Sequence, residues 1–152
     1  MKKRILILAA AFLTASCHKG TDPVVVLRDQ VDSAVYSTGD TDSLSALFAA
    51  YGREGNSYGE MVAARELGKR LRTGNRFYDA IDVHKKGLAA AEKLRDTIQA
   101  VQALNNIGTN YRRLGILDEA SSWHYRARSR RVDDPRIFCR FTLLIRSGVS
   151  AT

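Results

Sequence analysis

The chain is poor in proline and cysteine and contains no long apolar run. Its 152 residues include two prolines, Pro23 and Pro135, and two cysteines, Cys17 and Cys139. Two cysteines exclude the multi-disulfide framework of small secreted folds, so stability has to come from an apolar core. No apolar stretch reaches the roughly 20 residues that a membrane-spanning helix requires.

Sequence motifs that carry enzyme chemistry are also absent. The chain has no glycine-rich phosphate loop, no Gly-x-Ser-x-Gly and no His-Glu-x-x-His. Its His, Cys, Asp and Glu residues do not cluster at metal-ligand spacing. Asp118 and Glu119 suit the positive start of a helix better than a catalytic pair. We therefore expect no active site, no cofactor and no metal.

The first seventeen residues have the order of a secretory signal. Three basic residues at positions 2–4 precede an apolar run over 5–13, and Ala15 and Ser16 lead directly into Cys17. A basic segment, a short apolar segment and small residues before the cleavage point are the parts of a signal peptide. The sequence predicts an exported chain that begins, after processing, at Cys17.

A cysteine at the cleavage point makes residues 1–17 resemble a bacterial lipoprotein signal. In that family the peptidase cleaves before a cysteine whose thiol carries a diacylglyceryl group. The usual Leu three residues before the cysteine is displaced to Leu13, with Thr14 in its place. The resemblance implies lipid attachment at Cys17 and a place in the cell envelope, on the periplasmic or surface side of a membrane. The alternative is that Cys17 is an ordinary thiol.

The formal net charge of +8 overstates how basic the processed chain is. Cleavage before Cys17 removes the three positive charges at positions 2–4 and leaves a net charge of +5. The remaining segment 17–152 has a length that suits one modest domain. A charge of this size does not by itself indicate nucleic-acid binding, and an exported protein would rarely meet nucleic acid. We expect no nucleic-acid partner.

The region between the two prolines has a helical pattern. It is rich in Ala, Leu, Arg, Glu and Gln, and its apolar residues recur three to four positions apart, as in Leu104, Ile107 and Tyr111. The sequence predicts helices over about 24–36, 42–53, 58–73, 76–94, 97–114 and 117–130. Short connections would join them into antiparallel hairpins. The expected fold class is all-α.

The chain resembles itself at an offset of forty positions. Gly68 aligns with Gly108, and His84 aligns with His124. The other matches at this offset are Leu67 with Ile107, Asp79 with Glu119 and Ala80 with Ala120. A period of about 20–50 residues is typical of folds that stack one supersecondary unit on the next.

The second copy resembles the tetratricopeptide repeat. The positions that match the family pattern are Leu104, Ile107, Gly108, Tyr111, Gly115, Ala120 and Ala127. His124, Arg128 and Val132 stand where the family has an aromatic residue, Leu and Pro. The first copy matches less well, because Leu71 replaces the tyrosine and Gly74 lies one position early. The resemblance implies a short right-handed solenoid of two to three helix hairpins, in which His84 and His124 pack between helices.

The expected division of the chain has four parts. They are the signal peptide 1–16, an anchor segment with a leading helix 17–42, the repeats 43–134 and an atypical tail 135–152. The tail has β-branched and aromatic residues but no repeat match. Either the chain is cut short or shifted in frame relative to longer relatives, or the tail forms a short strand or helix that packs over the last repeat.

The tetratricopeptide resemblance also implies a binding groove. In that family the first helix of each hairpin lines a concave surface that binds a partner segment. The residues that fall on this surface are Arg65, Lys69 and Arg72 in the first copy and Asn105, Thr109 and Arg112 in the second. Each set follows one helical stripe at i, i+4 and i+7. They would form a basic groove for an acidic peptide or a chain-terminal carboxylate. The alternative is a solvated helix face.

These features predict a protein-interaction module rather than an enzyme. Lipid at Cys17 would hold the module at a membrane, and the groove would bind an extended or helical segment of a partner protein. The alternative is the input region of a bacterial signalling regulator whose membrane helix and kinase or DNA-binding domain are missing from this chain.

Overall fold

The structure is a computed structural model that describes residues 23–132. These residues form six helices and no strand, which confirms the all-α fold class. The helices are α1 (Pro23–Ser37), α2 (Thr41–Glu54), α3 (Ser57–Thr73), α4 (Phe77–Lys93), α5 (Thr97–Arg113) and α6 (Leu117–Val132). Their bounds differ from the predicted ones by at most two positions. The predicted signal segment 1–16, Cys17 and the tail 135–152 lie outside the described residues.

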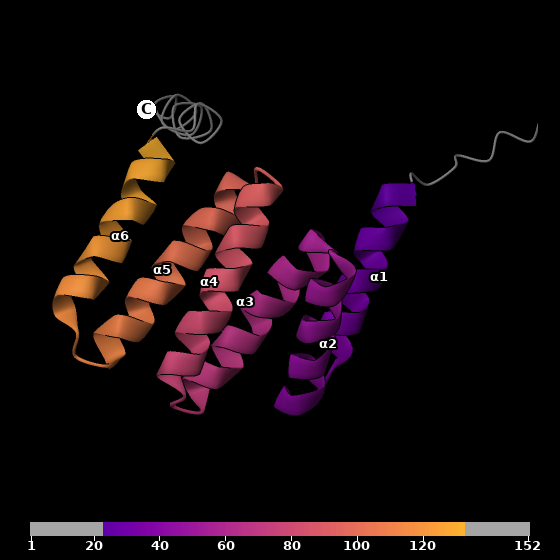
Figure 1. Ribbon diagram of the computed structural model, residues 1–152, viewed down its shortest axis with the longest axis horizontal. Helices are drawn as coiled ribbons and strands as arrows, with labels where there is room; N and C mark the ends of the chain where they lie inside the picture. The colour runs from indigo at the N-terminus through magenta and orange to yellow at the C-terminus, as the bar shows by residue number, and fades with distance from the viewer. Residues whose placement is uncertain (1–22, 133–152) are drawn as a thin grey trace, which may run out of the picture.

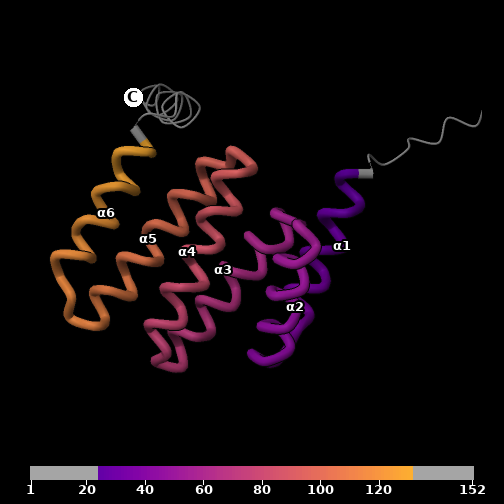
Figure 2. Tube along the Cα trace, viewed as in Figure 1, coloured from indigo at the N-terminus to yellow at the C-terminus, as the bar shows by residue number. Residues whose placement is uncertain are grey.

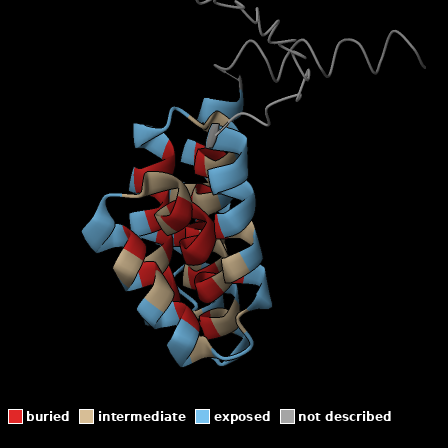
Figure 3. Cartoon of the chain, turned by 90° about the vertical axis from the view of Figure 1, so that its right-hand side faces the viewer, coloured by how far each residue is buried: buried red, intermediate tan, exposed pale blue. Residues whose placement is uncertain are grey.

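The helices stack roughly in chain order, except that the packing partner of α1 is α3. Figure 1 places α1 at one end of the molecule and α6 at the other, and the trace in Figure 2 reverses direction from each helix to the next. Helix α3 packs on α1, α2 and α4, helix α4 packs on α3 and α5, and α6 packs on α5. Buried residues follow the seams between helices while exposed residues cover the outside (Figure 3). One apolar core therefore runs through the whole stack.

A left-handed residue follows each helix from α2 to α5, at regular intervals of twenty positions. These residues are Gly55, Asn75, Arg95 and Gly115, with φ of 70°, 59°, 55° and 77°. Each is followed by a residue whose amide bonds a carbonyl five positions back, as in Ile116 N–H to Tyr111 O at 3.0 Å. This pairing of a left-handed residue with a long backward bond is the Schellman ending of a helix. The offset in the sequence therefore corresponds to two successive helix-plus-turn units.

The turn after α3 corrects one detail of the sequence alignment. Gly74 was expected to correspond to Gly115, one position out of register. Gly74 has φ of −81°, and the left-handed position is Asn75, the exact counterpart of Gly115 at the repeat offset. Asparagine tolerates this conformation better than most residues with a side chain, so the two turns are in register after all.

Polar side chains cap the starts of three helices. The carboxylate of Asp40 accepts from Ser43 N–H at 2.7 Å and opens α2. Asn56 caps α3 through Gly59 N–H, and Asp96 caps α5 through Gln99 N–H. Each cap satisfies an amide that the first helical turn leaves without a partner. Asn56 and Asp96 are separated by the same offset, which extends the internal repeat to the helix starts.

Two glycine–histidine contacts hold the paired helices close together. A Cβ on Gly68 would lie 2.4 Å from the His84 ring, and one on Gly108 would lie 2.9 Å from the His124 ring. Both pairs join a helix to the one that follows it. The rings therefore occupy the space that the missing side chains leave, and the predicted interhelical packing of His84 is confirmed by its 2% exposure. His124 is only half-buried, because α6 is the last of the described helices.

Candidate partner-binding surfaces

Two arginines of the predicted basic stripe of α3 reach neighbouring helices. The Arg65 guanidinium donates to Gln99 Oε1 on α5 at 3.1 Å and to the Tyr36 hydroxyl on α1. Arg72 donates to Asn106 Oδ1 on α5 at 3.2 Å. The gap that Arg65 lines together with Gln99 and Asn106 is small, with a volume of about 10 Å³, which is about the room that one water molecule needs. These two arginines join α3 to α5.

The other predicted residues are more exposed and are not all brought together. The Lys69 side chain is 65% exposed and lies 4.0 Å from Glu66 Oε1. Asn105 Oδ1 lies 3.2 Å from His124 Nδ1, and the Thr109 hydroxyl donates to the backbone carbonyl of Asn105. Arg112 is exposed near the end of α5. The second stripe therefore lies on the side of α5 where a further hairpin would pack, and the described chain has no helix there.

An open cleft lies between α2 and α4, with α3 as its floor. Its volume is about 790 Å³. The apolar part of its lining is Phe48, Ala49, Leu67, Leu71 and Val83, and the charged part is Asp42, Arg53, Glu60, Arg76, Asp79, Asp82 and Lys86. A concave space of this size is within the range of ligand sites, although its lining is more polar than that of most small-molecule pockets.

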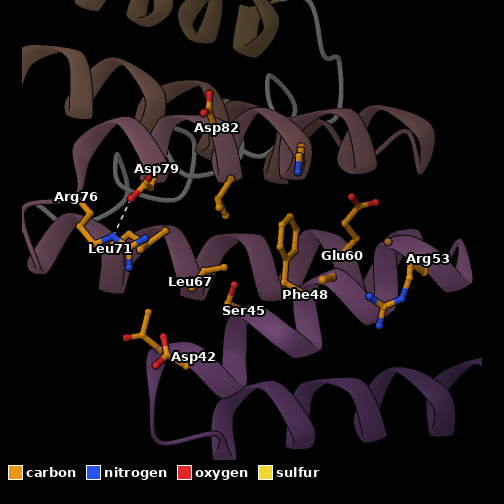
Figure 4. Close-up of a pocket in the computed structure, with 15 residues that line it drawn as sticks. Asp42, Ser45, Phe48, Arg53, Glu60, Leu67, Leu71, Arg76, Asp79 and Asp82 are labelled. Atoms are coloured by element: carbon orange, nitrogen blue, oxygen red, sulfur yellow. Dashed lines mark hydrogen bonds and ion pairs between the residues drawn. The ribbon is translucent and has the colours of Figure 1, made fainter.

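The charges of the cleft are arranged along its length. Figure 4 shows Asp42 and the Arg76–Asp79 pair at one end and Arg53 and Glu60 at the other, with Phe48 nearer the second end. Arg76 Nε lies 2.7 Å from Asp79 Oδ2, so that pair is largely neutralised. The charge left at this end of the cleft is the Asp42 carboxylate.

Lys86 of α4 places its ammonium group over an aromatic ring of α2 in the cleft. Its Nζ lies 5.8 Å from the centroid of the Phe48 ring, within the range of a cation–π contact. Phe48 is itself 7% exposed, so the ring forms the floor under the ammonium group.

His84 has the most perturbed titration in the described chain, but it does not form a site. Burial, with a smaller effect of the Arg72 guanidinium, lowers the pKa of His84 to about 4. Its Nε2 is buried without a hydrogen-bond partner. The ring is covered on one side by Gly68 and does not line the α2–α4 cleft. Its role is packing.

Residues 23–132 meet the requirements neither of a metal site with three or more ligands nor of a membrane-spanning helix. No group of three or more His, Cys, Asp or Glu side chains there is placed to hold a metal ion. Within the same range no helix combines the length and the apolar character that crossing a bilayer takes. The candidate sites of the described chain are therefore its surfaces and the α2–α4 cleft.

The sequence did not predict the cleft. Its acidic residues Asp42 and Asp79 occupy the first turns of α2 and α4, where they read as ordinary helix starts. Both lie toward the same end of the cleft (Figure 4), and this placement depends on the distance between α2 and α4 across α3. The one signal in the sequence was the matching position of the two carboxylates in their helices, each at the second or third residue.

No protein-family model matches this chain, and neither a curated protein nor a solved structure is significantly similar to it.

Proposed function

We propose that this chain is a protein-interaction module of tetratricopeptide-like hairpins, held at a membrane by lipid on Cys17. The observation that carries the binding part is the α2–α4 cleft, which is open, about 790 Å³ in volume and floored by apolar side chains. The recurrence of turns, caps and glycine–histidine contacts at regular sequence intervals supports the repeat architecture. Such architectures commonly present extended binding surfaces.

The occupant of the cleft would be a short segment of a partner protein. Apolar side chains of that segment would contact Phe48, Leu67 and Leu71. A basic group would face Asp42 and Asp82, and an acidic group would face Arg53 at the other end. Interactions of this kind fix the direction of a bound segment as well as its affinity. Lys69 on α3 and the α5 stripe of Asn105, Thr109 and Arg112 remain a second proposed surface, suited to an acidic segment.

The attachment to the membrane is proposed from residues 1–17 alone. One acyl chain gives only marginal binding, and two or more anchor a protein stably. The diacylglyceryl group that the lipoprotein resemblance implies on Cys17 would meet that requirement. Pro23 begins α1 six positions later, so the helical stack would lie within about 20 Å of the membrane surface even on an extended linker.

Cross-linking from the cleft tests the proposed function. A photoreactive residue at Ser45, which lines the cleft, is expected to capture a partner from the membrane fraction, and peptide mapping identifies the captured segment. Ala49→Trp fills the cleft and should abolish capture. Ala89→Trp is the matched control, because Ala89 is an exposed alanine of α4 outside the cleft lining. Capture that survives Ala49→Trp, or that is lost equally with Ala89→Trp, would remove the cleft as the binding site.

A further inference from the structure

Equivalent positions of α4 and α6 differ in burial. Ile81, Leu88 and Ala91 are buried and follow one stripe of α4. Their counterparts at the repeat offset are Ser121, Arg128 and Arg131, in the same order, and all three are exposed. Helix α4 packs on both α3 and α5, whereas α6 packs on α5. The stripe of α4 is therefore the surface that α5 covers. The corresponding surface of α6 is polar and exposed.

The same comparison applies to α3 and α5. Arg65 and Arg72 of α3 reach across to amide side chains of α5. Their counterparts on α5 are Asn105 and Arg112. Asn105 meets His124 at 3.2 Å, and Arg112 is exposed. The surface that α5 covers in the first copy thus has a counterpart on α5 and α6, which we call the α5–α6 groove, and no further helix of the described chain covers it.

Three arginines of this second groove have no carboxylate partner among the described residues. Arg128 and Arg131 on α6 and Arg112 on α5 take part in none of the ion pairs that the described residues form. By contrast, Arg130 pairs with Glu92 at 2.5 Å, and Arg126 stacks on Trp123 at 4.3 Å from its ring. An apolar helix docking as α5 does would bury guanidinium groups without partners, which is costly. The groove is therefore unsuited to an apolar occupant.

We propose that the open α5–α6 groove, defined by Arg112, His124, Arg128 and Arg131, binds an acidic helical segment of a partner protein. The guanidinium fork matches a carboxylate with two parallel hydrogen bonds. Arg128 and Arg131 are three positions apart, so they project from one face of α6. Ser121 to Arg131 spans about 15 Å, so carboxylates at helical spacing along about three turns of the partner would align with the groove. This surface is separate from the α2–α4 cleft, and its function does not depend on the cleft.

A designed peptide tests the proposal on the full processed chain. The probe is a fluorescent 16-residue helix of Ala, Leu and Lys with Glu at four positions spaced i, i+3, i+7 and i+10. The same helix with Gln at those positions is the peptide control. Binding is measured by anisotropy at 50, 150 and 500 mM salt. We expect the Glu peptide to bind at least tenfold more tightly than the Gln peptide at 50 mM salt and to weaken as salt rises.

The matched protein variants separate a specific site from general charge. Arg128→Glu with Arg131→Glu should weaken Glu-peptide binding at least tenfold. Lys93→Glu with Arg95→Glu makes the same change in net charge on the exposed end of α4 and the turn before α5, and should change binding less than threefold. Helix content by circular dichroism should stay constant in both, because all four residues are exposed. Arg128→Gln with Arg131→Gln gives the same expected loss without introducing repulsion.

Three results would overturn the proposal. They are equal binding of the Glu and Gln peptides, equal losses in the two reversal variants, and no binding of the Glu peptide at 50 mM salt. Ala49→Trp in the cleft should leave Glu-peptide binding unchanged. Failure of this proposal is therefore distinguishable from failure of the proposed cleft function.

Discussion

Gly68 and His84 fit together so closely that no side chain can be added to the glycine. A Cβ on Gly68 would lie 2.4 Å from two atoms of the imidazole, and the ring is 2% exposed. The counterpart pair, Gly108 and His124, has a longer distance of 2.9 Å and a half-buried ring. The first contact is therefore rigid, and the second can relax toward solvent.

We expect Gly68→Ala to destabilise the chain and Gly108→Ala to have little effect. Overpacking costs about 1–3 kcal/mol, and replacing glycine by alanine within a helix returns up to about 1 kcal/mol. At Gly68 the net loss should be about 1–2 kcal/mol, because His84 cannot move aside. Gly52→Ala is the control, since its Cβ would lie 3.5 Å from the nearest atom and should add stability. Urea unfolding measures all three, and equal losses at Gly68 and Gly108 would contradict the difference in rigidity.

The buried His84 predicts a loss of stability in mild acid. Its pKa is about 4 in the folded chain and about 6.5 in the unfolded chain. Above pH 6.5 the ring is neutral in both the folded and the unfolded state, so the titration of His84 does not lower the free energy of unfolding there. Between pH 6.5 and 4 only the unfolded state binds the proton, so stability falls by up to about 1.4 kcal/mol per pH unit, or about 3 kcal/mol in all.

The pH dependence can be assigned to His84 by substitution. His84→Phe removes the titrating group and keeps a ring at the position. The unfolded state of this variant binds one proton fewer between pH 6.5 and 4. The slope of unfolding free energy against pH should therefore be smaller by up to about 1.4 kcal/mol per pH unit. A slope that is the same in His84→Phe and in the original chain would show that other groups carry the pH dependence.

The left-handed turn residues Arg95 and Gly115 predict opposite changes in stability when a glycine is introduced at one and removed at the other. Arg95 has φ of 55°, a conformation that costs a residue with a side chain about 1–2 kcal/mol. Arg95→Gly should therefore raise the free energy of unfolding by about 0.5–1 kcal/mol. Gly115→Ala should lower it by about 1–2 kcal/mol, because Gly115 has φ of 77°.

Gly39 is the control for these turn variants. It is exposed, its φ lies outside the left-handed region, and an added Cβ would meet nothing within 4 Å. Gly39→Ala should raise stability slightly by restricting the unfolded chain, by about 0.4–1 kcal/mol. Thermal unfolding of the three variants checks the order, which would be wrong if Gly115→Ala were as stable as Gly39→Ala.

Cys17→Ser tests the proposed anchor. Processing and lipid attachment should fail, so the Ser variant should keep the mass of residues 1–152 and lose the diacylglyceryl mass. Mass spectrometry of the membrane fraction measures both. Cys139→Ser is the control and should leave the lipidated mass intact. A Ser variant that is still cleaved before position 17 and still carries lipid would exclude Cys17 as the attachment point.

The helices were predictable from sequence because the chain marks their ends. Glycine, asparagine and aspartate cluster at the turns, and the apolar spacing between them is helical, so the bounds were correct to within two positions. Gly115 was singled out by its place in the repeat pattern, whereas Gly74 drew attention away from its neighbour Asn75, which is the left-handed residue. Local signals identify a turn more reliably than they identify the residue that adopts the unusual φ.

The surfaces were less predictable, because they depend on distances between helices. The stripe of Arg65, Lys69 and Arg72 is on one side of α3, as its spacing implies. Nothing in the residue pattern indicated that Gln99 and Asn106 would lie within reach of Arg65 and Arg72. The α2–α4 cleft depends on the separation of two helices that are not neighbours in the chain.

The packing of each helix on helices close to it in the chain also determines how the molecule can come apart. Contacts between elements close in sequence give a low contact order, which favours rapid folding. Within the described chain α6 is held by α5, whereas α3 is held by helices on both sides. Detachment of α6 would break the α5 seam and leave the packing around α3 intact. Helix α1 at the other end packs on α3, so opening should proceed from both ends inward, with slow hydrogen exchange reached only at the amides of α3 and α4.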